Sequence, residues 1–140
     1  MRSDPEHPTH DQLDPVEVVA QAIRAISDLD VDEALRWVAA DLILELPFRS
    51  GGHPTTLVGA DAHAFLRFMP KVFARMEFHD VVIHGATPSG LIAAEYRSNG
   101  LTRTGKPYAN AYAAFFEVAD GQVTRWREYF NPEVVTEAML

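Results

Sequence analysis

The stretch WREYFNP, residues 126–132, combines an acidic side chain with large aromatic ones. If it forms a strand, alternation places Trp126, Glu128 and Phe130 on one face. A carboxylate on an apolar face is costly to bury in its ionised form, so it must be paired or have its pKa raised. A pKa near neutrality suits a general acid or base. The spacing therefore predicts Glu128 as a catalytic residue between two apolar walls.

Other interpretations of the polar side chains stay open. Glu128 could form a salt bridge of little energetic consequence at a wet cavity mouth, with Arg103, Arg125 or Arg127. Tyr96 could donate a hydrogen bond to a substrate oxygen across the cavity from Glu128. A buried tyrosine whose hydroxyl is satisfied by a neighbouring residue is equally consistent with the sequence.

The histidines do not have the spacing of a metal site. His79 and His84 lie five positions apart in one expected strand, so their side chains point to opposite faces unless a bulge intervenes. His84 is then the one expected to face the cavity. His53 lies in a glycine-rich loop that could form a mouth or lid. His63 is expected on the exposed side of a helix.

Composition limits the classes of protein that fit. The chain has 140 residues, 47% hydrophobic, and a net charge of −8 with only 12 Lys and Arg, which disfavours nucleic acid. It has no cysteine, which excludes disulfides and thiolate sites. No apolar run reaches membrane-spanning length. We expect a disordered tail over 1–13, one domain over 14–140 and a soluble, cytoplasmic protein without a cofactor.

Three helices are expected in the first half of the chain. The first opens at Asp14 and the second at Asp30, because each is an N-cap residue followed three positions later by a glutamate. The third begins at Asp61, and Pro70 is expected to kink or restart it. Asn131 and Pro132 can cap a last short helix ending at Met139.

One early strand and four later strands are predicted. The segment DLILELPF, 41–48, places Leu42, Leu44, Leu46 and Phe48 on one face, and 49–56 reads as a loop. The later strands are expected at about 78–86, 91–103, 107–119 and 122–130. Three helices with one early strand, followed by an antiparallel meander, indicate an α+β fold whose long twisted sheet curls into a cone around the helices.

The order of elements over residues 14–139 resembles the cone-shaped superfamily of nuclear transport factor 2, ketosteroid isomerase and the SnoaL-like polyketide cyclases. The stretch YANAYAAFFEVADGQVTRWREYFNP, 108–132, is similar to the end of the phenazine-biosynthesis A/B proteins. Those proteins have Tyr-x-Asn-x-aromatic, then Gly-x-apolar, then Arg-Glu-aromatic-x-Asn-Pro. The resemblance implies a curved, mixed sheet wrapped around three helices; it says less about function.

The same resemblance implies which positions of this chain correspond to catalytic residues of relatives. The isomerase base corresponds to Leu46, and its oxyanion-hole tyrosine and aspartic acid correspond to Ala22 and Ala113. Steroid-type isomerisation is therefore not expected. The cavity histidine and serine of the phenazine-type proteins correspond to Leu66 and Pro70.

One acidic position does match, because the glutamate of the Arg-Glu-aromatic motif corresponds to Glu128. The resemblance also implies that Tyr96, Ala113 and Phe115 face the cavity. Tyr108 and Tyr112 would then lie on the outer sheet face, where mixed polar and aromatic composition is typical of an interface. Because relatives commonly dimerise through this face, we expect a homodimer.

Two functions are consistent with these features. In the first, the protein is a cofactor-free enzyme that binds a compact, mostly apolar small molecule, with Glu128 moving a proton and Tyr96, His84 or His53 orienting an oxygen. Enol–keto isomerisation, aldol-type cyclisation, condensation and dehydration fit. In the second, it is a non-catalytic binding or scaffold protein. The expected cavity walls are Trp126, Phe130, Ala113, Phe115, Leu46, Phe48, Leu66 and Met69.

Overall fold

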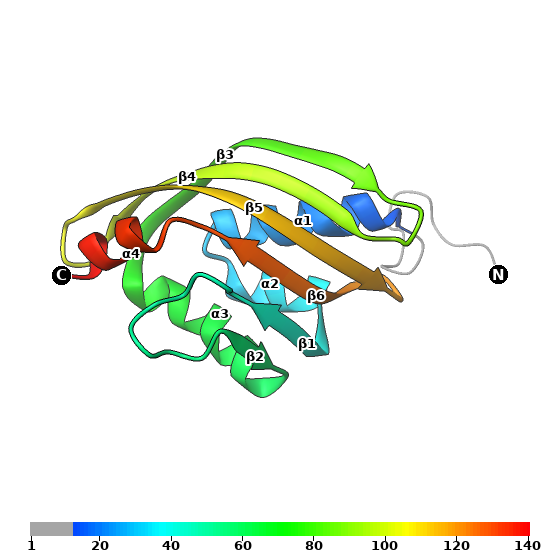
Figure 1. Ribbon diagram of the computed structural model, residues 1–140, viewed down its shortest axis with the longest axis horizontal. Helices are drawn as coiled ribbons and strands as arrows, with labels where there is room; N and C mark the ends of the chain where they lie inside the picture. Colours follow the sequence, from blue (N-terminus) through cyan, green and yellow to red (C-terminus); the bar gives the residue numbers. More distant parts are fainter. Residues whose placement is uncertain (1–12) are drawn as a thin grey trace.

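A computed structural model describes residues 13–140, so the predicted tail lies outside the described residues except for Leu13. The described chain forms a six-stranded sheet and four helices (Figure 1). In chain order the elements are α1 (Pro15–Ser27), α2 (Val31–Trp37), β1 (Val38–Glu45), β2 (Thr56–Val58), α3 (Ala60–Val72), β3 (Phe73–Ala86), β4 (Ile92–Thr102), β5 (Pro107–Ala119), β6 (Gln122–Tyr129) and α4 (Pro132–Met139).

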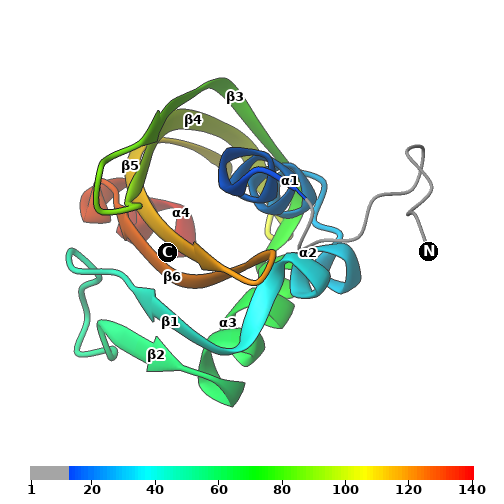
Figure 2. The same ribbon diagram turned by 90° about the vertical axis from the view of Figure 1, so that its right-hand side faces the viewer.

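The strands form one mixed sheet in the order β2-β1-β6-β5-β4-β3. Strands β1 and β6 run parallel, and every other neighbouring pair is antiparallel. Viewed from its end, the sheet curves around α1 without closing on itself (Figure 2). The expected α+β cone is therefore confirmed, including its mixed sheet.

The helices cover the concave side of the sheet, and α1, α2 and α4 start where the sequence predicts, whereas α3 starts at Ala60, one residue before Asp61. The Asp14 carboxylate accepts from the Val16 N–H at 2.7 Å, and the Asp30 carboxylate caps α2. Helix α3 runs on through Pro70, so the expected restart is wrong. Pro70 lies in the last turn, where its missing N–H removes a single helical hydrogen bond. No helix within residues 13–140 is long and apolar enough to cross a membrane.

Two strands depart from the prediction. Strand β3 begins at Phe73, directly after α3, rather than near residue 78. The short edge strand β2 begins at Thr56, the last residue of the segment expected as a loop, and continues over 57–58, for which no strand was predicted; it pairs only with β1. A three-residue strand that gains its hydrogen bonds from one neighbour carries too little periodicity to be seen in the sequence.

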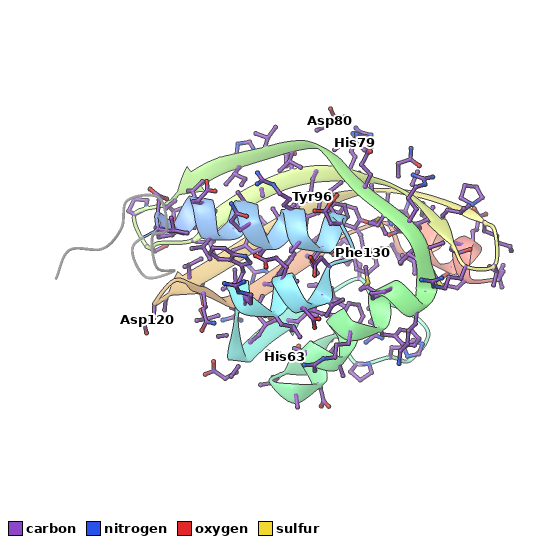
Figure 3. All side chains as sticks on the ribbon, turned by 180° about the vertical axis from the view of Figure 1, so that it is seen from behind. His63, His79, Asp80, Tyr96, Asp120 and Phe130 are labelled. Atoms are coloured by element: carbon purple, nitrogen blue, oxygen red, sulfur yellow. The ribbon has the colours of Figure 1, made fainter. Side chains whose placement is uncertain are left out.

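A bulge in β3 changes which face its histidines occupy. His79 pairs with Arg97, but Val82 pairs with Glu95, so one extra residue is inserted where Asp80 has φ +53°. The insertion reverses the alternation and puts His79 and His84 on the same, outer face. In Figure 3, His79 and Asp80 project away from the interior, where Tyr96 lies. The expectation that His79 and His84 oppose each other is therefore wrong.

Strands β3 and β4 approach closely at Gly100. A Cβ atom built on this residue would lie 2.9 Å from the Arg75 carbonyl oxygen and 3.4 Å from the Met76 side chain. The first contact is with backbone, which cannot rotate away as a side chain could. The absence of a side chain at Gly100 thus lets the two strands pair closely at this point, where Met76 is buried.

We predict that Gly100→Ala destabilises the protein by about 1–3 kcal/mol, because the added methyl group overpacks this crossing. The measurement is urea unfolding followed by circular dichroism. Asn99→Ala, at the exposed neighbouring position, is the matched control and should change the free energy of unfolding little. Equal stability of the two variants would show that the strand pair has room here.

Candidate functional site

A cavity of about 350 Å³ lies between the concave face of the sheet and the segments that cover it. Its walls come from β1, β3, β5 and β6, from helices α1, α3 and α4, and from the loop that follows β1. Most of the lining is apolar, and Glu128 is the lining carboxylate. This volume is at the small end of the range for ligand pockets, so the space suits a compact molecule.

Glu128 is held by a contact that passes over a neighbouring strand. It lies directly opposite Ala114 of β5, which in turn lies opposite Ala94 of β4. The hydroxyl of Tyr96, also on β4, donates to Oε1 of Glu128. Since β5 lies between β4 and β6, this contact needs a small side chain on the middle strand, and Ala114 supplies it. Tyr96 is labelled in the interior in Figure 3.

The environment of Glu128 favours its neutral form. Part of its surface is reached from the cavity, yet protein surrounds the carboxyl group, and this burial raises its pKa from 4.5 to about 7. The Tyr96 hydrogen bond and the nearby Trp126 indole N–H oppose that rise. Glu128 can therefore exchange a proton near neutral pH, as a general acid or base must.

The arginines proposed as alternative partners of Glu128 all lie elsewhere. Arg125 forms an ion pair with Glu45 at 2.6 Å on the outer face, and Arg103 donates to the Pro70 carbonyl. Arg127 stacks over the ring of Phe115. The salt-bridge interpretation of Glu128 is therefore wrong, and within residues 13–140 its hydrogen-bonding partner is a neutral hydroxyl.

Trp126 brings a second polar group to the same place. Its ring packs on Phe116 with centroids 4.9 Å apart, and the residue is buried. The indole N–H has no acceptor at hydrogen-bonding geometry within residues 13–140, although it lies near enough to Glu128 to lower the carboxyl pKa. An ionised Glu128 would offer it an acceptor after a small movement.

The side chains of β5 that point into the cavity are those that were expected on the outer face of the sheet. Tyr96 pairs directly with Tyr112, so both lie on the inner face, and Tyr112 and Tyr108 line the cavity. Ala113 and Phe115 lie on the outer face, so their expected cavity positions are wrong. Residues paired across an antiparallel ladder share a face of the sheet. An error of one residue in deciding which alternate residues point inward therefore places every side chain of the strand on the wrong face. The pairing of Glu128 with Ala114 fixes which residues point inward.

The remaining candidates divide between the cavity and the surface. Phe48 is 54% exposed and packs on Tyr129 outside the cavity, because the chain turns after β1. His84 is exposed and hydrogen-bonds to Glu95 at 2.8 Å, so neither it nor Phe48 lines the cavity. The candidates that do line it are Glu128, His53, Trp126, Phe130, Leu46, Leu66 and Met69. Figure 3 shows Phe130 in the interior.

His63 has a structural role that the sequence did not suggest. Its Nε2 lies 2.9 Å from the Ala39 carbonyl, which ties α3 to β1. Within residues 13–140 no three His, Asp, Glu or Cys side chains are grouped to hold a metal ion.

Sequence reasoning also missed Arg49 at the cavity. Its guanidinium lies over the Phe65 ring, 5.2 Å from the centroid, and donates to the Pro54 carbonyl at 2.9 Å. Burial lowers the pKa of this guanidinium, which nonetheless stays charged. The position of Arg49 in a Gly-rich loop with His53 was the available signal, but nothing in the sequence turns its side chain inward.

Comparison with known proteins gives consistent matches. A family model described as a SnoaL-like domain matches residues 19–126. The uncharacterised protein YesE of Bacillus subtilis strain 168 is 31% identical over 98 residues, covering 69% of this chain and 67% of that one. An uncharacterised PhzA/B-like protein of Pseudomonas aeruginosa is 24% identical over 125 residues, 88% of each chain.

Two solved structures extend the comparison to the fold. A proposed isomerase from Bacillus subtilis superposes with a TM-score of 0.81 and 25% identity, covering 91% of this chain and 96% of that one. A proposed polyketide cyclase from Xanthomonas campestris pv. campestris gives a TM-score of 0.73 and 26% identity, with 89% and 95% covered. The predicted resemblance in fold and in C-terminal motif is therefore confirmed.

The pKa of Glu128 predicts how stability depends on pH. A carboxyl whose pKa is higher in the folded state than in the unfolded state binds a proton more tightly when folded. Its contribution to stability is therefore complete below about pH 4.5 and is lost as pH rises through about 7. A shift of this size corresponds to at most about 3 kcal/mol.

We therefore expect Glu128→Gln, which cannot ionise, to be more stable relative to the wild type at pH 8 than at pH 5. Urea unfolding at both pH values measures the difference, which should grow by about 2–3 kcal/mol. Glu117→Gln, an exposed position on β5, is the control and should show no such growth. A pH-independent difference for Glu128→Gln would mean that this carboxyl is ionised in the folded protein at neutral pH.

Proposed function

Because this chain belongs to the family of SnoaL-like domains, we propose that it is a small acid/base enzyme acting on a compact, mostly apolar small molecule. Its similarity to a proposed isomerase and a proposed polyketide cyclase supports a cyclase- or isomerase-type fold. The observation that carries the proposal is a cavity carboxyl group whose pKa lies near 7.

In the proposed reaction Glu128 moves a proton between two atoms of the substrate. Its carboxylate takes a proton from the carbon next to a carbonyl group, and the electrons of that C–H bond form an enolate. The neutral carboxylic acid then returns the proton to another atom of the substrate, which completes an isomerisation. Alternatively, the enolate carbon attacks a second carbonyl carbon within the same molecule, which closes a ring. The oxygen of that second carbonyl group receives the electron pair of its C=O π bond and takes the proton back from the carboxylic acid. The substrate and the Glu128 carboxyl group supply all the atoms and electrons of this reaction, so it needs no cofactor.

Tyr96 acts on this chemistry through Glu128 and is a positioning residue. Its buried hydroxyl occupies Oε1, which leaves Oε2 free for the proton that is exchanged. Its expected direct contact with a substrate oxygen is replaced by this bond. His53 lines the cavity from the loop after β1 and remains a candidate for orienting the substrate.

The second candidate is a non-catalytic small-molecule-binding or scaffold protein of the same fold. The positions that correspond to a relative's catalytic base and helix histidine are Leu46 and Leu66, and both are apolar walls of this cavity. A cavity with these walls binds apolar molecules whether or not Glu128 performs chemistry. The catalytic test below separates the two functions.

We further propose that the protein forms a homodimer through the outer face of the sheet. Its location in the cytoplasm stays a prediction from the sequence. The residues on that face differ from the expected ones, because Tyr108 and Tyr112 point inward. Partly exposed Phe115, Tyr129 and Arg127 lie there together, with ring centroids of the two aromatics 6.2 Å apart. Aromatic and arginine side chains are enriched in interfaces.

The catalytic proposal predicts base-catalysed exchange of acidic C–H protons. With 2-tetralone as probe in D2O, the wild type should accelerate deuterium incorporation measured by NMR, with a rate that rises as pH passes through about 7. Glu128→Gln should slow the exchange at least about 100-fold while binding of the ketone is retained.

Glu117→Gln is the control for the exchange experiment and should behave as the wild type. Binding of 2-tetralone without any Glu128-dependent exchange would support the second candidate function instead.

The assembly proposal predicts a mass of about twice 15.6 kDa by size-exclusion chromatography with light scattering. Phe115→Glu should give the monomer, because it buries a charge without a partner in the interface. Ser89→Glu adds the same charge in an exposed turn and should leave the dimer intact. A mass near 16 kDa for the wild type at micromolar concentration would contradict the dimer.

A further inference from the structure

The opening of the cavity is marked by lining residues that are also exposed. Phe68 on α3 is 56% exposed and Met139 on α4 is 48% exposed, and both line the cavity. His53, in the loop after β1, also lines it and is exposed. Figure 1 shows α4, the end of α3 that leads into β3, and the turn between β4 and β5 at the same end of the molecule. The cavity therefore opens at this end, between α3 and α4.

Four cationic side chains lie on the α3 side of the opening, and we call them the basic patch. They are Arg67 and Lys71 of α3, and Arg103 and Lys106 of the turn between β4 and β5. None of the four forms an ion pair with another residue in 13–140. Residues 62–76 and 96–116 contain no Asp or Glu, although the whole chain has 20 of them and a net charge of −8. The basic patch is thus a local concentration of positive charge on an acidic protein.

Two separate segments of the chain build this patch around Phe68. Arg67 and Lys71 lie four positions apart, so they share one exposed face of α3, and Phe68 flanks them. The turn is tied to the end of this helix through Arg103, whose Nε donates to the Pro70 carbonyl at 2.6 Å. The Arg103 backbone N–H also donates to the carbonyl of residue 72, at 2.9 Å. An exposed aromatic ring at the cavity opening therefore lies beside unpaired cations.

The opposite side of the opening has the opposite charge. Helix α4 carries Glu133 and Glu137, which are both exposed, and Asp61 lies at the far end of α3 from Lys71. A negatively charged surface is therefore attracted to the α3 side of the opening and repelled by the α4 side. This difference sets how such a surface meets the molecule.

We propose that the basic patch and Phe68 dock the opening of the cavity on an anionic lipid surface. Lys and Arg side chains are attracted to the negative potential of such a surface, and an exposed aromatic ring gains by entering the boundary between headgroups and acyl chains. An acidic protein or a nucleic acid would also pair with the cations. A lipid surface offers in addition a continuous apolar phase to Phe68 and to the apolar opening beside it.

Docking on the α3 side turns the opening toward the acyl chains. An apolar molecule dissolved in the bilayer then enters the cavity without crossing water. This binding needs no membrane-spanning helix, because the protein lies on the surface. It goes beyond the proposed function and does not depend on it, so Glu128→Gln should bind lipid as the wild type does, whatever its effect on deuterium exchange.

Sedimentation with lipid vesicles tests the docking. At low ionic strength the full chain should bind vesicles made of equal parts of phosphatidylserine and phosphatidylcholine at least about tenfold more tightly than vesicles of phosphatidylcholine alone. Added salt should weaken this binding, because it screens the attraction. Equal affinity for the two vesicles, or binding to neither, would overturn the proposal. Binding to poly-L-glutamate without binding to the anionic vesicles would assign the basic patch to an acidic protein instead.

Charge reversal within the patch identifies the surface that binds. The double variant Arg67→Glu with Lys71→Glu should lose the preference for anionic vesicles. Arg24→Glu with Arg36→Glu is the matched control, because it makes the same change in net charge at exposed helical positions outside the patch, and it should keep most of the preference. An equal loss in both double variants would attribute the preference to net charge alone and contradict the docking site. Circular dichroism confirms that each variant is folded.

A fluorescent side chain at the opening shows which part of the molecule meets the lipid. Trp37 and Trp126 are buried, so a new indole at the surface reports on its own surroundings. The emission of Phe68→Trp should shift to the blue on addition of anionic vesicles and should be quenched by brominated acyl chains. Val82→Trp, at a 50% exposed position on the outer face of β3, is the control and should show neither effect. Quenching of Val82→Trp instead of Phe68→Trp would place the lipid on the outer face and overturn the proposal.

Discussion

The site depends on one hydrogen bond, from the Tyr96 hydroxyl to the Glu128 carboxyl, which crosses the strand between them. It forms because the intervening inward residue is Ala114, whose methyl group leaves the space above β5 open. A carboxyl group enclosed by apolar walls would otherwise lack any partner, at a substantial cost in free energy. The bond satisfies one oxygen without supplying a positive charge, so the group keeps a pKa near neutrality. The same hydrogen bond therefore allows Glu128 to be buried and leaves its carboxyl group able to exchange a proton near neutral pH.

The charged side chains of opposite sign near the site lie on different faces of the sheet. Arg125 and Arg127 lie outside, where the first pairs with Glu45 and the second stacks on Phe115. The inner face carries Glu128 and the hydroxyls of the tyrosines, with Arg49 approaching only from the loop after β1. This separation keeps a cation away from Glu128 and preserves its ability to exchange a proton. Leu46 and Leu66, which correspond to a base and a histidine of relatives, are apolar walls here, and the polar side chains that line the cavity come from β5, β6 and the loop after β1.

The sequence predicted much of this arrangement from local patterns. Helix starts at Asp14 and Asp30 follow from capping, and the strand face holding Trp126, Glu128 and Phe130 follows from alternation. Alternation gives two faces but does not say which one is inner. That choice was right for β6 and wrong for β5, where Ala113 and Phe115 were placed inside. His84 was misplaced for a related reason, because the bulge at Asp80 inserts one residue and reverses the faces beyond it.

By itself the sequence determined the element order apart from β2, the α+β class and the presence of an acid between aromatic walls, because these depend on periodicity and on residues close together in the chain. The tertiary structure decided how that acid is used. The contact of Tyr96 with Glu128 joins residues 32 positions apart. Asn110, which donates to the Tyr108 hydroxyl, is held by the backbone N–H of Asn131, 21 positions away. Such contacts depend on strand register and on the curvature of the sheet. Neither quantity is encoded in a local pattern, so the partners of Glu128 and the polar wall of the cavity emerge only when the sheet is assembled.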